Sequence, residues 1–137
     1  MSYDNPWTYY GLPFLEIPDK KYVAFVYEIT NKINGRKYIG KKLLQSSKTK
    51  QVNKKKKKIK VESNWRSYYG SNDELLNDIK EHGTEHFSRK ILKLCESKGT
   101  ANYWEMKYQI QEEVLERPDA YYNQWIIVKV HRSHIKS

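Results

Sequence analysis

Cysteine and long apolar runs are what this sequence has least of. Its 137 residues include one cysteine, Cys95, which excludes an internal disulfide and a zinc site built from several thiolates. Cys95 ends a short apolar run, so we interpret it as a buried core residue rather than a nucleophile. No apolar run is long enough to span a membrane, and no charged-then-apolar signal opens the chain. We therefore expect a cytoplasmic protein without a membrane partner.

Acidic residues are missing from one stretch, which runs from residue 41 to residue 60. It holds ten lysines and no aspartate or glutamate, whereas the whole chain has 26 basic residues, 16 acidic residues and a net charge of +10. The excess positive charge is therefore local. Such a block can be a solubilising tail, a localisation signal or a phosphate-binding segment. Because it lies inside the chain, we expect it to contact a polyanion, namely nucleic acid.

Aliphatic residues are also few, since hydrophobic residues make up only 38% of the chain. This fraction is low for a globular domain. Twelve tyrosines and four tryptophans raise the aromatic fraction to 14%, so we expect aromatic side chains to form much of the core. The length predicts one domain.

Residues 22–42 predict a β-hairpin around which the rest of the chain is organised. The first run, residues 22–29, is rich in β-branched and aromatic residues that alternate between the two faces of a strand. Asn34-Gly35 supplies the positive φ angles of a tight turn, and Arg36 to Lys41 forms the second strand. The pairing brings Tyr27 near Tyr38. Gly40 follows on the second strand, where a missing side chain lets a phosphate or another backbone approach closely.

The remaining elements complete an α+β fold in which helices flank a three-stranded antiparallel sheet. Residues 71–74 form a capping box that begins a helix ending near Gly83, and Phe87 to Cys95 predicts the third strand. A second helix begins at Thr100 and ends near Glu116, before Arg117-Pro118. The lysine-rich segment inserted after the hairpin is either a flexible loop or a basic ribbon.

Three parts of the chain follow from this reading. Residues 1–21, rich in proline and aromatic residues, form an extended arm packed on the surface. Residues 22–130 form the main domain, with the basic insertion at 41–63. Residues 131–137 form a short basic tail.

The second helix carries a carboxylate away from its expected core stripe. Glu105 shares a side of the helix with Ala101 and Tyr108. Spacing alone is compatible with a solvated glutamate or with a metal ligand. The stripe itself, at spacings of three and four residues, consists of Tyr103, Met106, Ile110 and Val114.

These features resemble the GIY-YIG nucleases. The first defining triplet is here Phe25-Val26-Tyr27, which keeps the tyrosine but not the glycine, and Tyr38-Ile39-Gly40 is an intact second triplet. Glu105, with an aromatic residue three positions on, looks like the family's metal-binding glutamate. Asn123, in a Tyr-Asn pair, looks like its asparagine near the end of the domain. The resemblance covers roughly residues 22–127 and looks most like the small phage-encoded members related to homing endonucleases.

The resemblance implies a metal-dependent endonuclease that hydrolyses DNA by nicking or by double-strand cleavage, with RNA not excluded. Glu105 would hold one Mg²⁺ or Mn²⁺ through a hard carboxylate oxygen. Tyr27 would act as general base, with its pKa lowered by the metal and by Lys37, Lys41 or Lys42. Tyr38 and Gly40 complete the site. Asn123 would bind phosphate, orient a neighbouring side chain or serve a turn.

The sequence departs from the family where a catalytic arginine is expected, because no arginine lies between Arg36 and Arg66. Lys41, Lys42 or Arg66 could clamp the phosphate instead, although a lysine offers a point charge rather than a bidentate fork. Tyr69 stands where relatives often carry a histidine and could take over its hydrogen-bonding role.

Affinity for DNA would come from the basic segment. Two other interpretations stay open, namely a catalytically silent nucleic-acid-binding module and an RNA- or ribosome-associated basic protein. A separate DNA-reading module does not fit in this length, so the site would be chosen weakly by the loop and tail, by a partner or by a homodimer, in the host cytoplasm if the protein is phage-encoded. The expected DNA-binding residues are Lys37, Lys42, Lys48, Lys50, Lys54, Lys55, Lys56, Lys57, Lys58, Lys60 and Tyr69.

Overall fold

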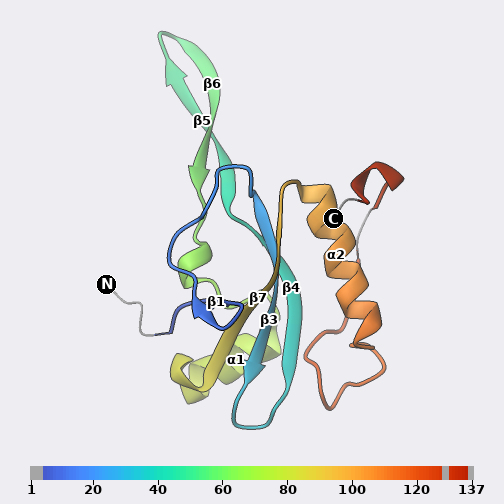
Figure 1. Cartoon of the computed structure of the whole chain (residues 1–137). Coiled ribbons are helices and arrows are strands. Elements are labelled where there is room, and N and C mark those ends of the chain that lie inside the picture. The colour runs from blue at the N-terminus through green and yellow to red at the C-terminus, as the bar shows by residue number, and fades with distance from the viewer. Residues whose placement is uncertain (1–4, 128–129, 136–137) are drawn as a thin grey trace.

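The computed structural model describes residues 5–127 and 130–135 (Figure 1). The first four residues of the expected arm, residues 128–129 and the last two residues of the tail lie outside the described residues. The elements are β1 (Thr8–Tyr9), β2 (Leu12–Pro13), β3 (Ala24–Asn31), β4 (Lys37–Leu43), β5 (Gln45–Val52), β6 (Lys55–Glu62), η1 (Trp65–Ser67), α1 (Asp73–His82), η2 (Thr84–His86), β7 (Phe87–Cys95), α2 (Lys98–Gln111) and η3 (Arg132–His134).

The main sheet has five strands in the order β2-β1-β7-β3-β4. The α+β class and the antiparallel β7-β3-β4 core are confirmed, and β7 has the expected bounds. The expected total of three strands is wrong because the N-terminal arm adds β1, parallel to β7, and β2. Trp7 and Phe14 flank these short strands and are buried in the core, which holds the arm on the sheet.

Alternate residues of β3 face opposite sides of the sheet, and both sides are covered. Phe25 and Tyr27 pack in a core with α1, η1 and the arm. Val26 packs in a second core with α2. Figure 1 shows α1 and α2 on opposite sides of the sheet. The strand is therefore buried on both faces, as expected of a central strand.

Both helices begin or end at residues other than those expected. The cap of α1 is Asn72, whose side chain accepts from the Leu75 amide, and not Ser71. The cap of α2 is Ser97, and α2 ends at Gln111 because Glu113 adopts φ 54°, a left-handed conformation that terminates helices. No helix among the described residues is long and apolar enough to cross a membrane.

The core stripe expected on α2 is wrong at Ile110, which is 57% exposed. Val114 is buried as expected, but it lies in the turn after the helix, because α2 ends at Gln111. Ala101 and Gln109 are buried against the sheet instead. The side of α2 that carries Ala101 and Glu105 therefore faces the sheet.

The lysine-rich segment forms a basic ribbon, one of the two expected alternatives. β5 and β6 pair antiparallel over eight residue pairs and make a separate two-stranded sheet. Asn53 and Lys54, both with positive φ, form the turn at its tip. Figure 1 shows this ribbon projecting beyond the end of the main sheet.

Candidate active site

Three tyrosines meet on the α1 side of the hairpin. Tyr27 is 1% exposed, and its ring centroid lies 6.2 Å from that of Tyr38 and 6.0 Å from that of Tyr68. Tyr27 pairs across the hairpin with Gly40, and its ring occupies the space over that glycine. The ammonium of Lys42 lies 4.1 Å from the centroid of the Tyr68 ring. A basic group thus borders the phenol cluster.

Burial governs the acidity of these phenols. Burial raises the pKa of Tyr27 well above its usual value of 10, and the neighbouring tyrosines Tyr68 and Tyr38 raise it further. Burial also raises the pKa of Tyr38, and it lowers the pKa of Lys42. In the metal-free protein, loss of hydration therefore keeps the pKa of Tyr27 high, and the lowering expected from a bound metal stays a prediction.

Tyr38 is the member of this cluster that reaches an open cavity. Its hydroxyl lies 3.4 Å from the Ser71 hydroxyl, in front of α1. A surface hollow of about 470 Å³ opens beside it, lined also by Asn72, Asn123 and Trp125. A polar ligand of nucleotide size could therefore approach the Tyr38 hydroxyl directly.

Backbone groups on the free edge of β4 are hydrogen-bonded by residues 120–123 and by α2. At Lys37, the backbone bonds to the carbonyl of Ala120 and the amide of Tyr122. Asn123 accepts from the Ile39 amide at 3.0 Å and donates to the Ile39 carbonyl at 2.8 Å. Gln109 donates to the same carbonyl at 2.9 Å.

Glu105 continues this row of edge contacts. Its carboxylate accepts a hydrogen bond from the Lys41 backbone and lies 3.9 Å from the Lys41 ammonium. The side chain is 14% exposed, and burial raises the pKa of Glu105 even though the charge and backbone amide of Lys41 favour ionisation. Its negative charge acts on Tyr27 and Tyr38, raising the pKa of both. The carboxylate therefore stands near the phenols although α2 lies on the opposite face.

The donor set fits a magnesium-type ion held mainly by water and substrate. No group of three or more His, Cys, Asp or Glu side chains in the described part of the chain could hold a metal. Mg²⁺ needs few protein ligands, because it keeps several waters and takes others from substrate phosphates. Glu105 is a suitable single carboxylate for such an ion.

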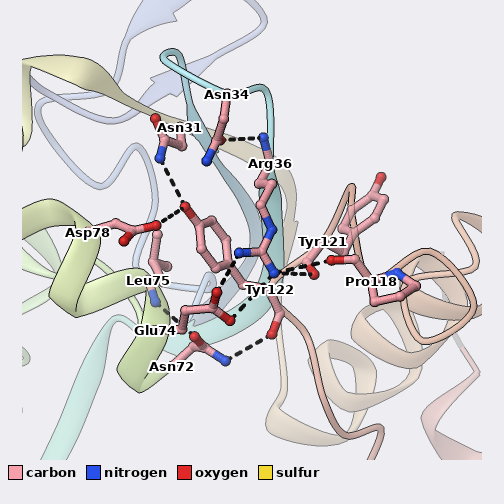
Figure 2. Close-up of polar contacts among 10 residues, drawn as sticks. All are labelled: Asn31, Asn34, Arg36, Asn72, Glu74, Leu75, Asp78, Pro118, Tyr121 and Tyr122. Carbon is pink, nitrogen blue, oxygen red and sulfur yellow. Dashed lines mark hydrogen bonds and ion pairs between the residues drawn. The ribbon is translucent and has the colours of Figure 1, made fainter.

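The segment that carries Asn123 is fixed by the contacts drawn in Figure 2. The Tyr122 hydroxyl accepts from Asn31 at 2.9 Å and donates to Asp78 at 2.7 Å. The Arg36 guanidinium stacks over the Tyr122 ring and pairs with Glu74 at 2.6 Å. The hairpin turn and α1 therefore hold Tyr122, which places the next residue against Ile39. In the free protein Asn123 therefore holds the backbone of β4, a contact that was not among the three roles left open for it. Its contact with phosphate stays a prediction.

Three expected site residues lie away from the tyrosine cluster. Arg66 pairs with Glu62 at 3.0 Å and Glu16 at 3.2 Å, at the foot of the ribbon. Lys37 lies 3.7 Å from Glu28. The Tyr69 hydroxyl accepts from Asn5, and its ring lies against a buried arginine.

Tyr68 contributes to the cluster in place of Tyr69. Its side chain hydrogen-bonds that of Tyr27, whereas its neighbour points toward the arm. The sequence offers two adjacent tyrosines in an irregular segment, and no periodicity there distinguishes which one faces the hairpin.

Those ribbon lysines whose side chains are described are exposed, and they lie beyond the site rather than in it. The described side chains are those of Lys48, Lys54, Lys55, Lys56, Lys57, Lys58 and Lys60, all of them exposed, while the side chain of Lys50 lies outside the described part.

Comparison with known proteins identifies the family of the chain. A family model described as "Putative endonuclease segE, GIY-YIG domain" matches residues 7–126. The chain is also similar to the "Putative endonuclease segE" of Enterobacteria phage T4, with 35% identity over 91 residues. That alignment covers 66% of this chain and 33% of the phage protein, so the chain spans about a third of its relative's length. No solved structure matched the chain. Because the family model covers most of the sequence, the chain belongs to the GIY-YIG endonuclease family.

Proposed function

We propose that this protein is a metal-dependent endonuclease that hydrolyses DNA phosphodiester bonds at the edge of β4. The observation that carries the proposal is the convergence of Tyr27, Tyr38 and Glu105 around Gly40 and Lys41. The three side chains come from both faces of the sheet, yet the Glu105 charge acts on both hydroxyls. Hydrolysis of a phosphodiester needs a base, a compensating positive charge and a proton for the leaving oxygen.

Tyr27 is the proposed base, which takes the proton of the attacking water. Its raised pKa means that the free protein keeps this phenol neutral. With a divalent ion bound beside the substrate, the Tyr27 phenol would lose its proton to solvent, because nearby positive charge favours the phenolate. The phenolate would then take a proton from the attacking water and give it to the leaving oxygen. Tyr38, at the open hollow, orients the water or the phosphate.

Lys42 is the proposed phosphate clamp. Its ammonium lies at the cluster, against the Tyr68 ring, and burial lowers its pKa. An approaching phosphate would stabilise the charged form of Lys42 that burial disfavours. Lys41, paired with Glu105, can serve beside it. Arg66 is the weaker candidate, because its guanidinium is already paired with two carboxylates.

Glu105 is the residue that would hold the metal. GIY-YIG nucleases generally use divalent ions, and we expect Mg²⁺ or Mn²⁺ here because the ligand is a hard carboxylate oxygen. When bound, such an ion supplies positive charge that stabilises the phosphate and the leaving oxygen.

A catalytically silent binding module is the second candidate. The absence of the first glycine of the GIY triplet, with Phe25 in its place, and the upward-shifted pKa of Tyr27 favour it. Such a protein would retain DNA affinity without turnover.

Supercoiled plasmid incubated with and without Mg²⁺ or Mn²⁺ tests the proposal. Wild-type protein should produce open circles or linear DNA only with metal, and Glu105→Gln and Tyr27→Phe should each lower the rate at least about a hundredfold. Glu116→Gln, on an exposed turn, is the carboxylate control. Tyr121→Phe removes the hydroxyl of another buried tyrosine, which donates to Glu112 away from the tyrosine cluster, and is the phenol control. Both controls should cut like wild type.

The ratio of open circles to linear molecules then separates nicking from double-strand cleavage. Absence of cleavage by the wild type, together with retardation of the same DNA, would select the silent module. Cleavage that survives Glu105→Gln would contradict the assigned site.

A further inference from the structure

We propose that the β5–β6 ribbon is an arm that enters the major groove of B-form DNA and holds the duplex beside the candidate active site. This inference rests on the proposed function. It adds the element that holds the nucleic acid and the groove through which it does so.

The positive charge of the ribbon is not balanced by acidic residues within the ribbon. Its one acidic residue is Glu62, at its foot, and that carboxylate already pairs with Arg66 at 3.0 Å. The lysines repel one another, and β5 and β6 pack almost entirely on each other. A lone two-stranded hairpin is only marginally stable in water. Binding along a polyanion would neutralise the repulsion and stabilise the ribbon.

The cross-strand register gives one face of the ribbon a regular chemistry. Lysines on β6 stand opposite short or flexible polar residues on β5, and directly paired residues of an antiparallel ribbon share a face. This face can therefore offer ammonium groups to phosphates and amide or hydroxyl groups to base edges. The pairs are Lys56 with Gln51, Lys58 with Thr49, and Lys60 with Ser47.

The dimensions of the ribbon select the groove. Eight residue pairs at roughly 3.4 Å per residue give a length of about 27 Å. The major groove of B-DNA, about 12 Å wide, admits a two-stranded ribbon. The major groove of an RNA duplex is too narrow for side chains to read, and its minor groove is shallow. A ribbon of this kind fits duplex DNA.

The foot of the ribbon joins it to the candidate active site. β4 runs into β5 through Leu44, which is buried, and Ser63 after β6 bonds back to the carbonyls of Leu43 and Leu44. A hollow of about 390 Å³ beside this junction is lined by Lys41, Lys42 and Lys98 among others. A basic path therefore connects the site to the ribbon, so a duplex held by the ribbon could also lie against β4.

The test uses a 30-base-pair DNA duplex, one strand of it alone and the matching RNA duplex, without divalent metal. The ribbon variant is Lys56→Gln/Lys58→Gln/Lys60→Gln. Its control, Lys20→Gln/Lys32→Gln/Lys80→Gln, removes the same charge from exposed lysines elsewhere. The ribbon variant should bind duplex DNA about tenfold or more weakly. The slope of log binding constant against log salt concentration should be less steep by about 2.7, because each of three lost phosphate contacts contributes about 0.9.

Methylation of the DNA by dimethyl sulfate then shows which groove the protein occupies, because guanine N7 lies in the major groove and adenine N3 in the minor groove. Wild-type protein should protect guanine N7, and the ribbon variant should lose that protection. Protection of adenine N3 alone, equal affinity for the RNA duplex, or a ribbon variant that binds like the control would each overturn the proposal.

A shortened ribbon separates this proposal from the nuclease assignment. Joining Ser47 to Lys60 through Asn-Gly removes the outer ribbon and leaves its foot and the main sheet in place. With the divalent metal restored, this variant should keep its kcat on plasmid and show a KM raised about tenfold or more. An unchanged KM would refute the ribbon's role while leaving the nuclease intact. Protection of guanine N7 by a wild type that never cleaves would refute the nuclease and leave the ribbon's role standing.

Discussion

The hydroxyl oxygen of Tyr27 stands 2.6 Å from the point at which Gly40 would carry a Cβ atom. The same Cβ would lie 2.8 Å from Cζ of Tyr27 and 3.0 Å from Cε2 of Tyr38. The glycine of the YIG triplet is thus required by the phenol ring that lies over it and not by an unusual φ angle. Its missing side chain places the proposed base against the strand that carries Tyr38.

Gly40→Ala should therefore displace the Tyr27 ring. Overpacking of a core typically costs about 1–3 kcal/mol, and the buried ring has no open space into which to move. We expect the free energy of unfolding in urea to fall by that amount and the rate of plasmid cleavage to fall at least about tenfold, because the base is shifted.

Gly35→Ala is the matched control for this substitution. Gly35 has φ 78°, so alanine there is strained, but nothing lies within 4 Å of its added Cβ. It should lose about 1 kcal/mol of stability and keep its cleavage rate. Equal loss of activity in both variants would show that stability, and not the position of Tyr27, limits cleavage.

Asn123 and Gln109 should be energetically coupled through Ile39. Asn123→Leu leaves the Ile39 amide without its partner and should cost about 1–3 kcal/mol, whereas Gln109→Leu should cost less because Asn123 still donates to the carbonyl. In the double variant that carbonyl loses both side-chain donors. The double variant should therefore lose more free energy of unfolding than the two single variants lose in sum.

Urea denaturation of the four proteins measures this coupling. Gln124→Leu, at the exposed neighbouring position, serves as the control and should change stability by less than about 0.5 kcal/mol. Strict additivity of the two buried substitutions would contradict a shared clamp on Ile39.

Patterns local in sequence predicted the central elements of this fold. The first strand of the hairpin is a run of alternating β-branched and aromatic residues, and β7 is an apolar-rich run that has the expected bounds. β1 and β2 are two residues long and carry no period, and they exist because Trp7 and Phe14 bury beside them. Their formation depends on tertiary contacts that no short window of sequence contains.

The candidate site was predictable in its residue types but less so in its arrangement. The triplet Tyr38-Ile39-Gly40 and Glu105 could be picked out through their resemblance to the family. The contacts of Gln109 with Ile39 could not, because a glutamine in a helix usually lies in solvent and this one is buried only through the docking of α2 on β4. The wrong end predicted for α2 has a similar cause, since Glu113 takes the left-handed position that glycine usually fills.

Arg89 should be essential for holding the segment that carries Tyr68. It is 4% exposed and donates to the carbonyls of Asn5, Arg66 and Tyr68 at 2.6, 3.0 and 2.8 Å. Burial lowers the pKa of Arg89 to about 10, which still leaves it charged at neutral pH. Arg89→Met would leave those carbonyls unpaired and should cost roughly 2–4 kcal/mol.

Urea unfolding measures that loss, and plasmid cleavage at a temperature where the variant stays folded measures the effect on the site. Activity should fall at least about tenfold, because the Tyr68 backbone loses its fixed position. Arg117→Met removes an exposed arginine that donates to a single carbonyl and should cost less than about 1 kcal/mol. An Arg89→Met protein that cleaves like wild type would contradict a positioning role.

Glu105→Gln should abolish cleavage and yet raise the thermal midpoint of the metal-free protein at pH 7. Burial raises the pKa of Glu105 above its unfolded value, so ionising this group costs more free energy in the folded state than in the unfolded state. Below the unfolded pKa both states are neutral and this cost is absent. Wild type therefore loses stability relative to Glu105→Gln as the pH rises through the two pKa values.

Thermal unfolding of both proteins from pH 3.5 to pH 7 measures this difference, with Glu116→Gln as the exposed control. The midpoints of wild type and Glu105→Gln should converge at the acidic end and separate toward neutrality, while the control should follow wild type throughout. A Glu105→Gln protein less stable than wild type at pH 7 would mean that the contacts of the carboxylate with Lys41 outweigh its burial. Glu105 would then be a structural ion pair, whereas greater stability together with lost cleavage is the behaviour of a carboxylate kept for chemistry at a cost to the fold.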